Sequence, residues 1–313
     1  MPPDHFADGK LIAVDWGTSR LRMWLLDDAG RAIAGESSDE GIARTGTGHE
    51  ATFERLAANW PRVPAIMAGM VGSRQGWREA PYVPCPADAP AISAGMMRFE
   101  TATGRPVAIV PGVAVTIGGA DVMRGEETQL LGLLDSQRDF SGTAILPGTH
   151  SKWARLDNNR IVDFQSFMSG ELFELLARKS FLRHSVAEDA GDLAALPAFE
   201  AAIRQTVIEG LPFLSALFPI RARQLLSNTQ PDDNLAYLSG LVIGGEIAAA
   251  RAGGRLPDGE RVSIVGARSL ARAYRDALAI SGHDSETLDG NELVLAGLAG
   301  IARVAGMLAE AKP

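Results

Sequence analysis

The sequence contains a single cysteine, Cys85, among its 313 residues. One thiol cannot form an internal disulfide, so the chain suits a reducing compartment. Cys85 lies between Pro84 and Pro86. We interpret it as a packed side chain and not as a catalytic thiol.

Basic residues are in the minority. The chain has 30 Lys and Arg against 38 Asp and Glu, a net charge of −8. A nucleic-acid-binding protein would show a basic face, which this balance argues against. A local basic cluster for one small anion remains compatible with the composition.

Long uninterrupted apolar runs are absent. Residues 234–250 and 293–308 come nearest, but Glu246 and Arg303 interrupt them, and both are shorter than the ~20 apolar residues that span a membrane. The segment 1–5 has neither the basic nor the apolar region of a signal peptide. We therefore expect a cytoplasmic protein with no membrane partner.

The overall composition is that of a globular protein, with 46% hydrophobic and 22% charged residues. A chain of this length is long for one hydrophobic core and comfortable for two domains.

Three short strands are predicted at the start of the chain, at 11–15, 21–26 and 32–36. Tight turns join them, which favours an antiparallel meander over a parallel crossover. The segments that follow in this half are listed in order: a helix over 49–60, a strand over 65–68 and a strand over 107–110.

The second half repeats this order. A helix is predicted over 121–134, and strands follow at 143–146, 152–156 and 160–164. The remaining predicted elements are helices at 170–180, 197–217 and 232–251, a strand at 262–265, and helices at 268–280 and 292–309. The repeat of strand, turn, strand, turn, strand indicates a duplicated α/β architecture with a boundary near 115–120.

The first turn of the repeat carries Gly17, Thr18 and Ser19 after Asp15. Gly17 lets the backbone approach a ligand closely, and exposed N–H and hydroxyl groups can bind phosphate. Asp15 at the strand end can hold a hydrated Mg²⁺ ion. An ordinary hairpin turn explains this short motif equally well.

The equivalent turn of the second half carries Gly148, Thr149 and His150. Two Gly-Thr turns at equivalent places are what a nucleotide cleft between duplicated domains requires. His150 is either a phosphate donor or a solvated turn residue.

Acidic residues gather in the segment 121–129. Glu126 follows Gly125, and a carboxylate there could accept the proton of an attacking hydroxyl. The alternative is that Asp121, Glu126 and Glu127 complement the positive end of a helix dipole.

A strand-to-helix switch occurs at Gly266 and Ala267. Two small residues there leave room for a purine or its ribose, although many α/β crossovers look alike.

These pieces, in this order, resemble the actin-like ATPase superfamily, which includes sugar kinases and hexokinases. Longer motifs resemble more closely one family in it, the 2-dehydro-3-deoxygalactonokinases. These motifs span residues 13–19, 67–77, 121–131, 146–153 and 221–223.

The resemblance implies an α/β fold of two actin-like (ribonuclease H-like) domains with a nucleotide cleft between them. We assign residues 1–118 to an N-terminal domain with the sugar-acid and phosphate site, and 119–313 to a C-terminal domain with the nucleotide site. The last helix would pack back at the domain interface.

The implied activity is phosphorylation of the 6-hydroxyl of 2-dehydro-3-deoxy-D-galactonate by ATP and Mg²⁺ in galactonate breakdown. Glu126 would be the base, with Glu127 or Asp121 as alternatives. The predicted phosphate and nucleotide residues are Gly17, Thr18, Ser19, Gly148, Thr149, His150, Gly266 and Ala267.

The substrate carboxylate calls for a cation, and an Arg fork matches its geometry. Arg74 and Lys152 are the candidates, with Gln75 and Trp77 beside the sugar. Trp77 could cover an apolar face of the sugar, and a packing role at the rim of the site explains it equally well. A kinase for another sugar acid, such as 2-keto-3-deoxygluconate, or for a neutral sugar stays open. So do a regulatory actin-like ATPase and a homodimer.

Overall fold

The computed structural model describes residues 6–189 and 191–309. Residues 1–5, for which the sequence predicts no signal peptide, lie outside the described residues. The chain forms two compact units. Residues up to Phe140, with Asp157–Asp163 and those from Asn291, make the first unit, and Ser141–Leu156 with Phe164–Gly290 make the second. The predicted boundary after residue 118 does not coincide with this division.

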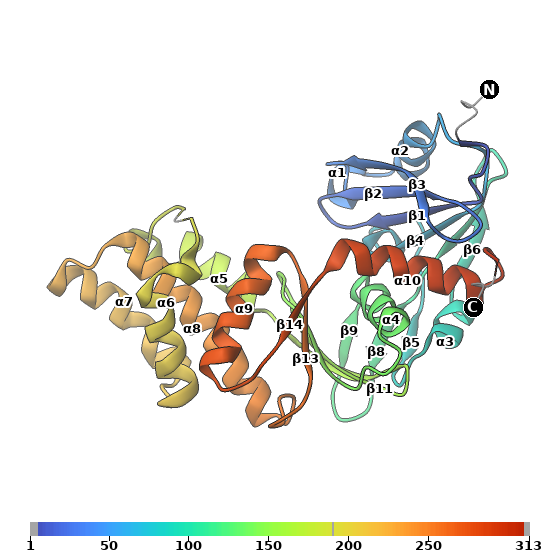
Figure 1. The fold of residues 1–313 in the computed structure, drawn as a ribbon. Helices are drawn as coiled ribbons and strands as arrows, with labels where there is room; N and C mark the ends of the chain where they lie inside the picture. The colour runs from blue at the N-terminus through green and yellow to red at the C-terminus, as the bar shows by residue number, and fades with distance from the viewer. Residues whose placement is uncertain (1–5, 190, 310–313) are drawn as a thin grey trace. The chain divides into compact units, whose positions relative to one another are not determined.

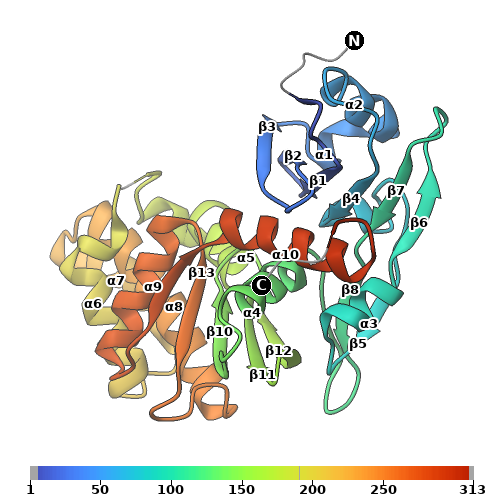
Figure 2. The same ribbon diagram turned by 45° about the vertical axis from the view of Figure 1, so that its right-hand side comes forward.

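The first unit is built on a six-stranded sheet in the order β3-β2-β1-β4-β7-β6. Its strands are β1 (Leu11–Trp16), β2 (Leu21–Leu26), β3 (Ala32–Ser38), β4 (Ala65–Ala68), β6 (Met97–Glu100) and β7 (Pro106–Ile109). Strands β1, β4 and β7 run parallel, and the outer pairs are antiparallel. The β6–β7 hairpin closes one edge of the sheet (Figure 2).

The other elements of this unit are listed in chain order: α1 (Ile42–Thr45), α2 (His49–Leu56), η2 (Met70–Gly72), β5 (Tyr82–Pro84), α3 (Ala89–Ala94), β8 (Gly112–Val115), β9 (Asp121–Met123), α4 (Glu126–Ser136) and α10 (Gly290–Val304). Helices α4 and α10 lie side by side (Figure 1). A Cβ atom at Gly297 would lie only 1.9 Å from the Thr128 carbonyl oxygen, and one at Gly132 only 2.0 Å from that of Leu293. This close crossing explains why the last helix belongs to the first unit.

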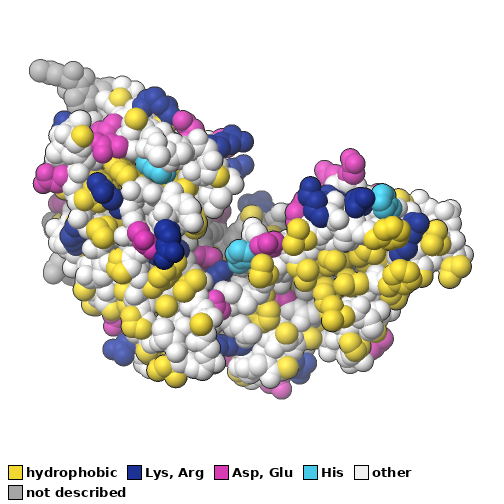
Figure 3. Space-filling model, turned by 180° about the vertical axis from the view of Figure 1, so that it is seen from behind, with side chains coloured by type: hydrophobic (Ala, Val, Ile, Leu, Met, Phe, Trp, Pro, Cys, Tyr) yellow, Lys and Arg dark blue, Asp and Glu magenta, His cyan; other side chains and the backbone are white. Residues whose placement is uncertain are grey.

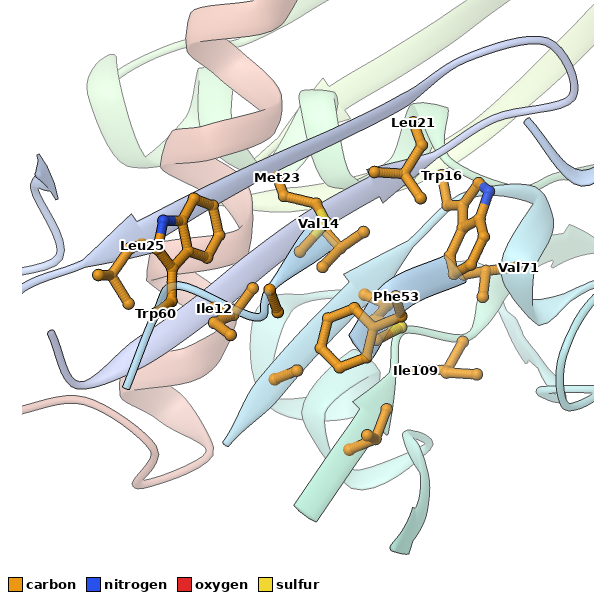
Figure 4. Close-up of a cluster of buried hydrophobic side chains, with 14 of the residues drawn as sticks. Ile12, Val14, Trp16, Leu21, Met23, Leu25, Phe53, Trp60, Val71 and Ile109 are labelled. Carbon is orange, nitrogen blue, oxygen red and sulfur yellow. The ribbon is translucent and has the colours of Figure 1, made fainter. Parts of the chain in front are cut away.

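The core of the first unit follows from the alternation of apolar residues along its strands. Ile12, Val14 and Trp16 of β1 point to one face, where side chains of β2 meet them (Figure 4). Phe53 of α2 covers the same cluster and is fully buried. Successive strand residues point to opposite faces, so this pattern fixes which side of β1 meets the core.

The second unit repeats the strand order, with a five-stranded sheet β12-β11-β10-β13-β14. Its strands are β10 (Gly142–Leu146), β11 (Ser151–Asp157), β12 (Arg160–Phe167), β13 (Val262–Gly266) and β14 (Glu286–Asp289). In both sheets the central strand pairs antiparallel with the next strand of its hairpin, β1 with β2 and β10 with β11. On its other side two strands run parallel to it, β4 and β7 in the first sheet and β13 and β14 in the second. The predicted duplication and the α/β ribonuclease H-like fold class are thus confirmed.

The helices of the second unit are α5 (Ser169–Glu174), α6 (Pro197–Ile203), α7 (Phe213–Ser227), α8 (Pro231–Ala252) and α9 (Arg268–Ile280). The short helical segments η3 (Leu175–Lys179), η4 (Phe181–His184), η5 (Leu193–Ala195) and η6 (Arg204–Ile208) lie between them. Side chains of α6, α8 and α9 pack against those of β10, β11 and β13 in one core.

Some predicted helix boundaries are wrong. Residues 121–123 form β9 and not a helix start, and α4 begins at Glu126 because Gly125 has φ of 108°. The predicted helix 197–217 is broken, since Pro212 starts α7 anew after Gly210 with φ of 71°. The helices predicted over 49–60 and 292–309 end earlier, at Leu56 and Val304.

Among the residues that the structure describes, one helix, α8, is long and apolar enough to cross a membrane by length and composition alone. However, 67% of its most apolar window is buried inside the protein. It packs against α6 and α9, so its apolar character is explained by its place in the core.

Hydrophobic side chains are exposed along one face of the second unit (Figure 3). They belong to α5, α7 and the segments near them. The exposed residues are Met168, Leu172, Leu175, Phe181, Ile208, Leu214, Phe218, Leu225 and Leu226.

Candidate functional site

In the first unit, Asp15 lies near the end of β1, opposite Arg22 of β2. The Arg22 guanidinium contacts the Asp15 carboxylate at 2.9 Å. Burial raises the pKa of Asp15, Arg22 opposes this rise, and the nearby Glu126 charge adds to it. Asp15 is thus a shielded carboxylate with one oxygen bound to a cation and a second acid close by.

The first Gly-Thr turn connects β1 to β2. The Gly17 N–H donates to the Arg20 carbonyl at 2.9 Å, and the Ile42 N–H donates to the Gly17 carbonyl at 3.0 Å. Thr18 and Ser19 are exposed. The first residue of α1 therefore hydrogen-bonds to the backbone of the turn, and the two hydroxyl residues of the turn, Thr18 and Ser19, are open to solvent.

Two glycines bring the start of α4 next to the end of β4. Gly69 has φ of 94°, and a Cβ atom there would lie 2.8 Å from the Trp16 carbonyl oxygen. A Cβ atom at Gly125 would lie 3.3 Å from the Gly69 Cα. Only glycine fits both requirements. This packing places Glu126 close enough to Asp15 for the two charges to interact.

The two adjacent glutamates of α4 differ in environment. Glu127 is fully buried, and its carboxylate accepts the Gly125 N–H at 2.6 Å and the Thr128 hydroxyl at 3.0 Å. Burial, with the Glu126 charge second, raises the pKa of Glu127 from 4.5 to about 8. Glu126 is only partly buried and accepts the Arg124 N–H at 3.1 Å. Of the two, Glu126 is the one that a substrate could reach.

Asp121, the third acidic candidate, lies on β9 and not on the helix. Its carboxylate accepts the N–H of Val122 at 2.8 Å. The helix-dipole interpretation therefore applies to Glu126 and Glu127, which are in the first turn of α4, and not to Asp121.

The loop after β4 carries two of the predicted substrate residues on its surface. Arg74 and Gln75 are exposed, and the Arg74 side chain is 82% exposed. Its Nε lies 3.5 Å from a Glu79 oxygen, which is a weak, solvated pair. Arg74 is thus free to change partner at little cost.

Trp77 has a different environment. Its ring lies 5.0 Å from that of Phe99 and 6.4 Å from that of Trp16, measured between centroids, and it packs on the core cluster. These contacts explain Trp77 by packing. Its predicted place beside the sugar gains no support from them.

The second Gly-Thr turn, in the second unit, is held by the start of α5. The Glu171 N–H donates to the Thr149 carbonyl at 3.0 Å, and the Glu171 carboxylate lies 2.6 Å from Nε2 of His150. A Cβ atom at Gly170 would lie 2.4 Å from the Gly148 carbonyl oxygen, so the helix start touches the turn. Thr149 and His150 themselves are exposed.

Lys152 lies in β11 and is 4% exposed. Its Nζ donates to the His150 carbonyl at 2.8 Å. Lys152 therefore supports the turn, and it belongs to the second unit whereas Arg74 belongs to the first. The structure does not bring these two predicted carboxylate ligands together within one unit.

The Gly266–Ala267 switch ends β13 and precedes α9. A Cβ atom at Gly266 would lie 3.7 Å from the Pro147 carbonyl oxygen, so this switch adjoins the second Gly-Thr turn. Beside it is a surface pocket of about 710 Å³. The pocket is lined by Gly191, Asp192, Leu193, Ala194, Ser239, Arg268, Ser269, Leu270, Arg272 and Ala273.

Within residues 6–189 and 191–309, no group of three or more His, Cys, Asp or Glu side chains could hold a metal ion by itself. A single carboxylate such as Asp15 suits Mg²⁺, which keeps much of its water and shares its coordination with phosphate oxygens.

Two residues near the predicted site were not anticipated. Arg22 pairs with Asp15, and Glu171 contacts His150. The signal for Arg22 was present, since the hairpin register places it directly across from Asp15. Glu171 is 21 positions from His150, and no local pattern predicts that the two residues pair.

Comparison with known proteins gives a consistent result over nearly the full chain. A family model described as 2-keto-3-deoxy-galactonokinase matches residues 15–301. The probable 2-dehydro-3-deoxygalactonokinase DgoK1 of Rhizobium meliloti (strain 1021) is 42% identical over 304 residues, covering 94% of this chain and 97% of that protein. The 2-dehydro-3-deoxygalactonokinase of Escherichia coli (strain K12) is 32% identical over 299 residues, with the same coverages of 94% and 97%.

A solved structure agrees. The crystal structure of a Sinorhizobium meliloti protein assigned as a 2-dehydro-3-deoxygalactonokinase is 41% identical, with a TM-score of 0.88. The match covers 94% of this chain and 98% of that protein.

Proposed function

Because this chain belongs to the 2-keto-3-deoxy-galactonokinase family, we propose that it transfers the γ-phosphoryl group of ATP to the 6-hydroxyl of 2-dehydro-3-deoxy-D-galactonate. The observation that carries this proposal is the likeness over nearly the whole chain to relatives named for that activity. The reaction would take place in the cytoplasm, as one step of galactonate breakdown.

The chemical roles follow from the two units. In the first, Glu126 would accept the proton of the substrate hydroxyl as its oxygen attacks the γ-phosphorus. The bond from that phosphorus to the β–γ bridging oxygen breaks, and ADP leaves. The Gly148 N–H group and the Thr18 and Thr149 hydroxyls would bind phosphate oxygens. Gly17, whose own N–H donates to the Arg20 carbonyl, would let the first turn approach the phosphate closely.

The nucleotide base has a candidate place in the second unit. The 710 Å³ pocket begins next to the Gly266–Ala267 switch, which itself adjoins the second Gly-Thr turn. An adenosine that extends from the second Gly-Thr turn past Gly266 and Ala267 would reach the wall of the pocket that α9 forms. We therefore assign Gly266 and Ala267 to the nucleotide.

Asp15 would hold Mg²⁺ through water, and the ion would neutralise charge on the phosphate oxygens. Asp15→Asn should raise the Mg²⁺ concentration that gives half-maximal rate about tenfold, as is typical when an outer-shell partner is lost. The KM for the sugar acid should stay unchanged. Rates measured across a Mg²⁺ titration check this.

Asp27→Asn is a matched control for this variant, because Asp27 also pairs with an arginine, Arg31 at 2.8 Å, in the same unit. It should leave the Mg²⁺ dependence as in the wild type. An Asp15→Asn enzyme with unaltered Mg²⁺ dependence would refute the assignment.

Arg74 would pair with the substrate carboxylate, since its guanidinium is exposed and only weakly engaged. Arg74→Ala should raise the KM for the sugar acid about tenfold, a modest loss because solvent screens an exposed pair. The KM for ATP should stay the same. Arg78→Ala is the control, because Arg78 is an exposed arginine of the same loop that stacks over Phe99. Equal effects of both substitutions would contradict a specific role for Arg74.

One assay tests the proposed function as a whole. ADP release is measured with 2-dehydro-3-deoxy-D-galactonate, with its 4-epimer, the gluconate form, and with galactose. A site that hydrogen-bonds one hydroxyl disfavours the epimer, because polar groups are then left unpaired. If only the gluconate epimer is phosphorylated, the protein is still a sugar-acid kinase but its substrate is the epimer. ADP release that is independent of any acceptor would favour an ATPase instead.

A further inference from the structure

A buried carboxylate lies behind the second Gly-Thr turn and has no role in the chemistry above. Glu246 is in the C-terminal half of α8 and is 3% exposed. One of its oxygens accepts the Ser151 hydroxyl at 2.7 Å and the Trp153 indole N–H at 2.6 Å. The other accepts the Tyr274 hydroxyl at 2.8 Å.

Ser169 also donates to this carboxylate, so four donors converge on one side chain. All four are neutral groups. A carboxylate has about four acceptor positions and no donor, whereas an amide accepts only through its single oxygen. Only an acidic side chain can therefore accept from all four at once.

The donors belong to the elements that surround the second Gly-Thr turn. Ser151 directly follows His150, the last residue of the turn. Ser169 is the first residue of α5. The next residue, Gly170, packs against the Gly148 carbonyl oxygen, and the Glu171 N–H donates to the Thr149 carbonyl of the turn. Both sides of the turn are thus tied to one carboxylate.

Tyr274 extends this network to the adenosine side. It lies on α9, which starts two residues after Gly266 and forms a wall of the 710 Å³ pocket. Glu246 therefore connects the phosphate turn, the helix that backs it, and the helix assigned to adenosine.

We infer that Glu246 is a positioning residue that fixes the second Gly-Thr turn relative to α5 and α9, and so presents the turn to ATP in one geometry. This inference rests on the proposed function, because it needs the turn to bind nucleotide. Stability alone is a weak explanation for this side chain, since a buried carboxyl group with no cationic partner is less favourable than a well-packed apolar side chain of similar size, even when it is hydrogen-bonded.

The test is Glu246→Gln, which keeps the shape but offers an amide in place of two acceptor positions. The dissociation constant of ADP, measured by calorimetry, and the KM for ATP should both rise about tenfold, as expected when a supporting contact shifts a binding group. The KM for the sugar acid should not change. A purely structural role would lower thermal stability and leave these nucleotide constants at their wild-type values.

Glu260→Gln is the matched control. Glu260 is a mostly buried acid of the same unit, bound to Thr143 and Arg155 at the opposite end of β10. Its substitution should cost stability without changing ADP binding. If the folded Glu246→Gln protein binds ADP as tightly as the wild type, the inference is overturned.

A second variant covers the case in which Glu246→Gln does not fold. Tyr274→Phe keeps the ring in the core and removes one donor, and it should weaken ADP binding about threefold, in line with one lost hydrogen bond. Unchanged ADP binding in this variant would then overturn the inference. A wild-type protein that binds ADP but does not phosphorylate the sugar acid would refute the proposed function and leave this inference intact.

Discussion

Replacing Glu126 by Gln should lower kcat by about 100-fold, the range expected when general-base assistance is lost. The side chain is partly buried at the first turn of α4, near Asp15, and glutamine cannot accept the hydroxyl proton. Binding of ATP should change little, because Glu126 is assigned to contact the hydroxyl oxygen of the sugar acid and not the nucleotide. Steady-state kinetics with both substrates measure the separation of kcat from KM.

A near-normal kcat in the variant would exclude Glu126 as the base. Glu127 and Asp121 would then be substituted in turn.

Replacing the neighbouring Glu127 by Gln should have the opposite kind of effect, a gain in stability at alkaline pH. The raised pKa, from 4.5 to about 8, means that the folded protein favours the neutral acid. Each pKa unit corresponds to about 1.4 kcal/mol, so the full shift is worth on the order of 5 kcal/mol. Glutamine keeps an acceptor oxygen for the Gly125 N–H, and its amide N–H can donate to the Thr128 hydroxyl, which donates to Glu127 in the wild type, without a charge to bury.

The sign follows from which state binds the proton more tightly. Below about pH 4.5 both folded and unfolded chains are protonated at Glu127, and the stabilising contribution of the neutral acid is fully present. Between about pH 4.5 and 8 the unfolded chain ionises first, so that contribution is lost as the pH rises. Denaturant unfolding should show that the free energy of unfolding of Glu127→Gln, relative to that of the wild type, is higher at pH 8.5 than at pH 5.5.

Glu54→Gln is a control of opposite sign. Burial acts to raise the pKa of Glu54, but hydrogen bonds and charge from Arg105 outweigh it and lower the pKa. This contribution is present at neutral pH and is lost as the pH falls through the lowered pKa, so Glu54→Gln should destabilise the protein most at neutral pH. If Glu127→Gln shows no gain between pH 5.5 and 8.5, the buried carboxyl is ionised in the folded protein.

Local sequence determined the frame of both units. The runs at Leu11–Trp16 and Leu21–Leu26 are short, mostly apolar and separated by a four-residue turn, a pattern that favours a hairpin. Hairpin register alone then set Asp15 opposite Arg22, because residues pair in a fixed order away from a tight turn. The same order of short strands and tight turns recurs in the second half of the chain. This recurrence predicted the duplicated architecture and the two equivalent Gly-Thr turns.

Tertiary structure decided what the local pattern could not. The acidic segment 121–127 is helical by composition, yet Asp121–Met123 pairs with β8 and forms a strand, because sheet pairing outweighs weak helix propensity. Glu126 and Glu127 are equivalent in sequence, and only the packing of α4 buries the second and leaves the first within reach.

The same holds for contacts between residues far apart in the chain. The sequence left Trp77 open between a place at the sugar and a packing role, and its three aromatic neighbours from other elements support packing. Glu246 appeared only as a break in an apolar run, while its donors come from β11, α5 and α9. Propensity and periodicity report on neighbours along the chain, whereas burial and hydrogen-bond partners depend on segments that meet only when the chain has folded.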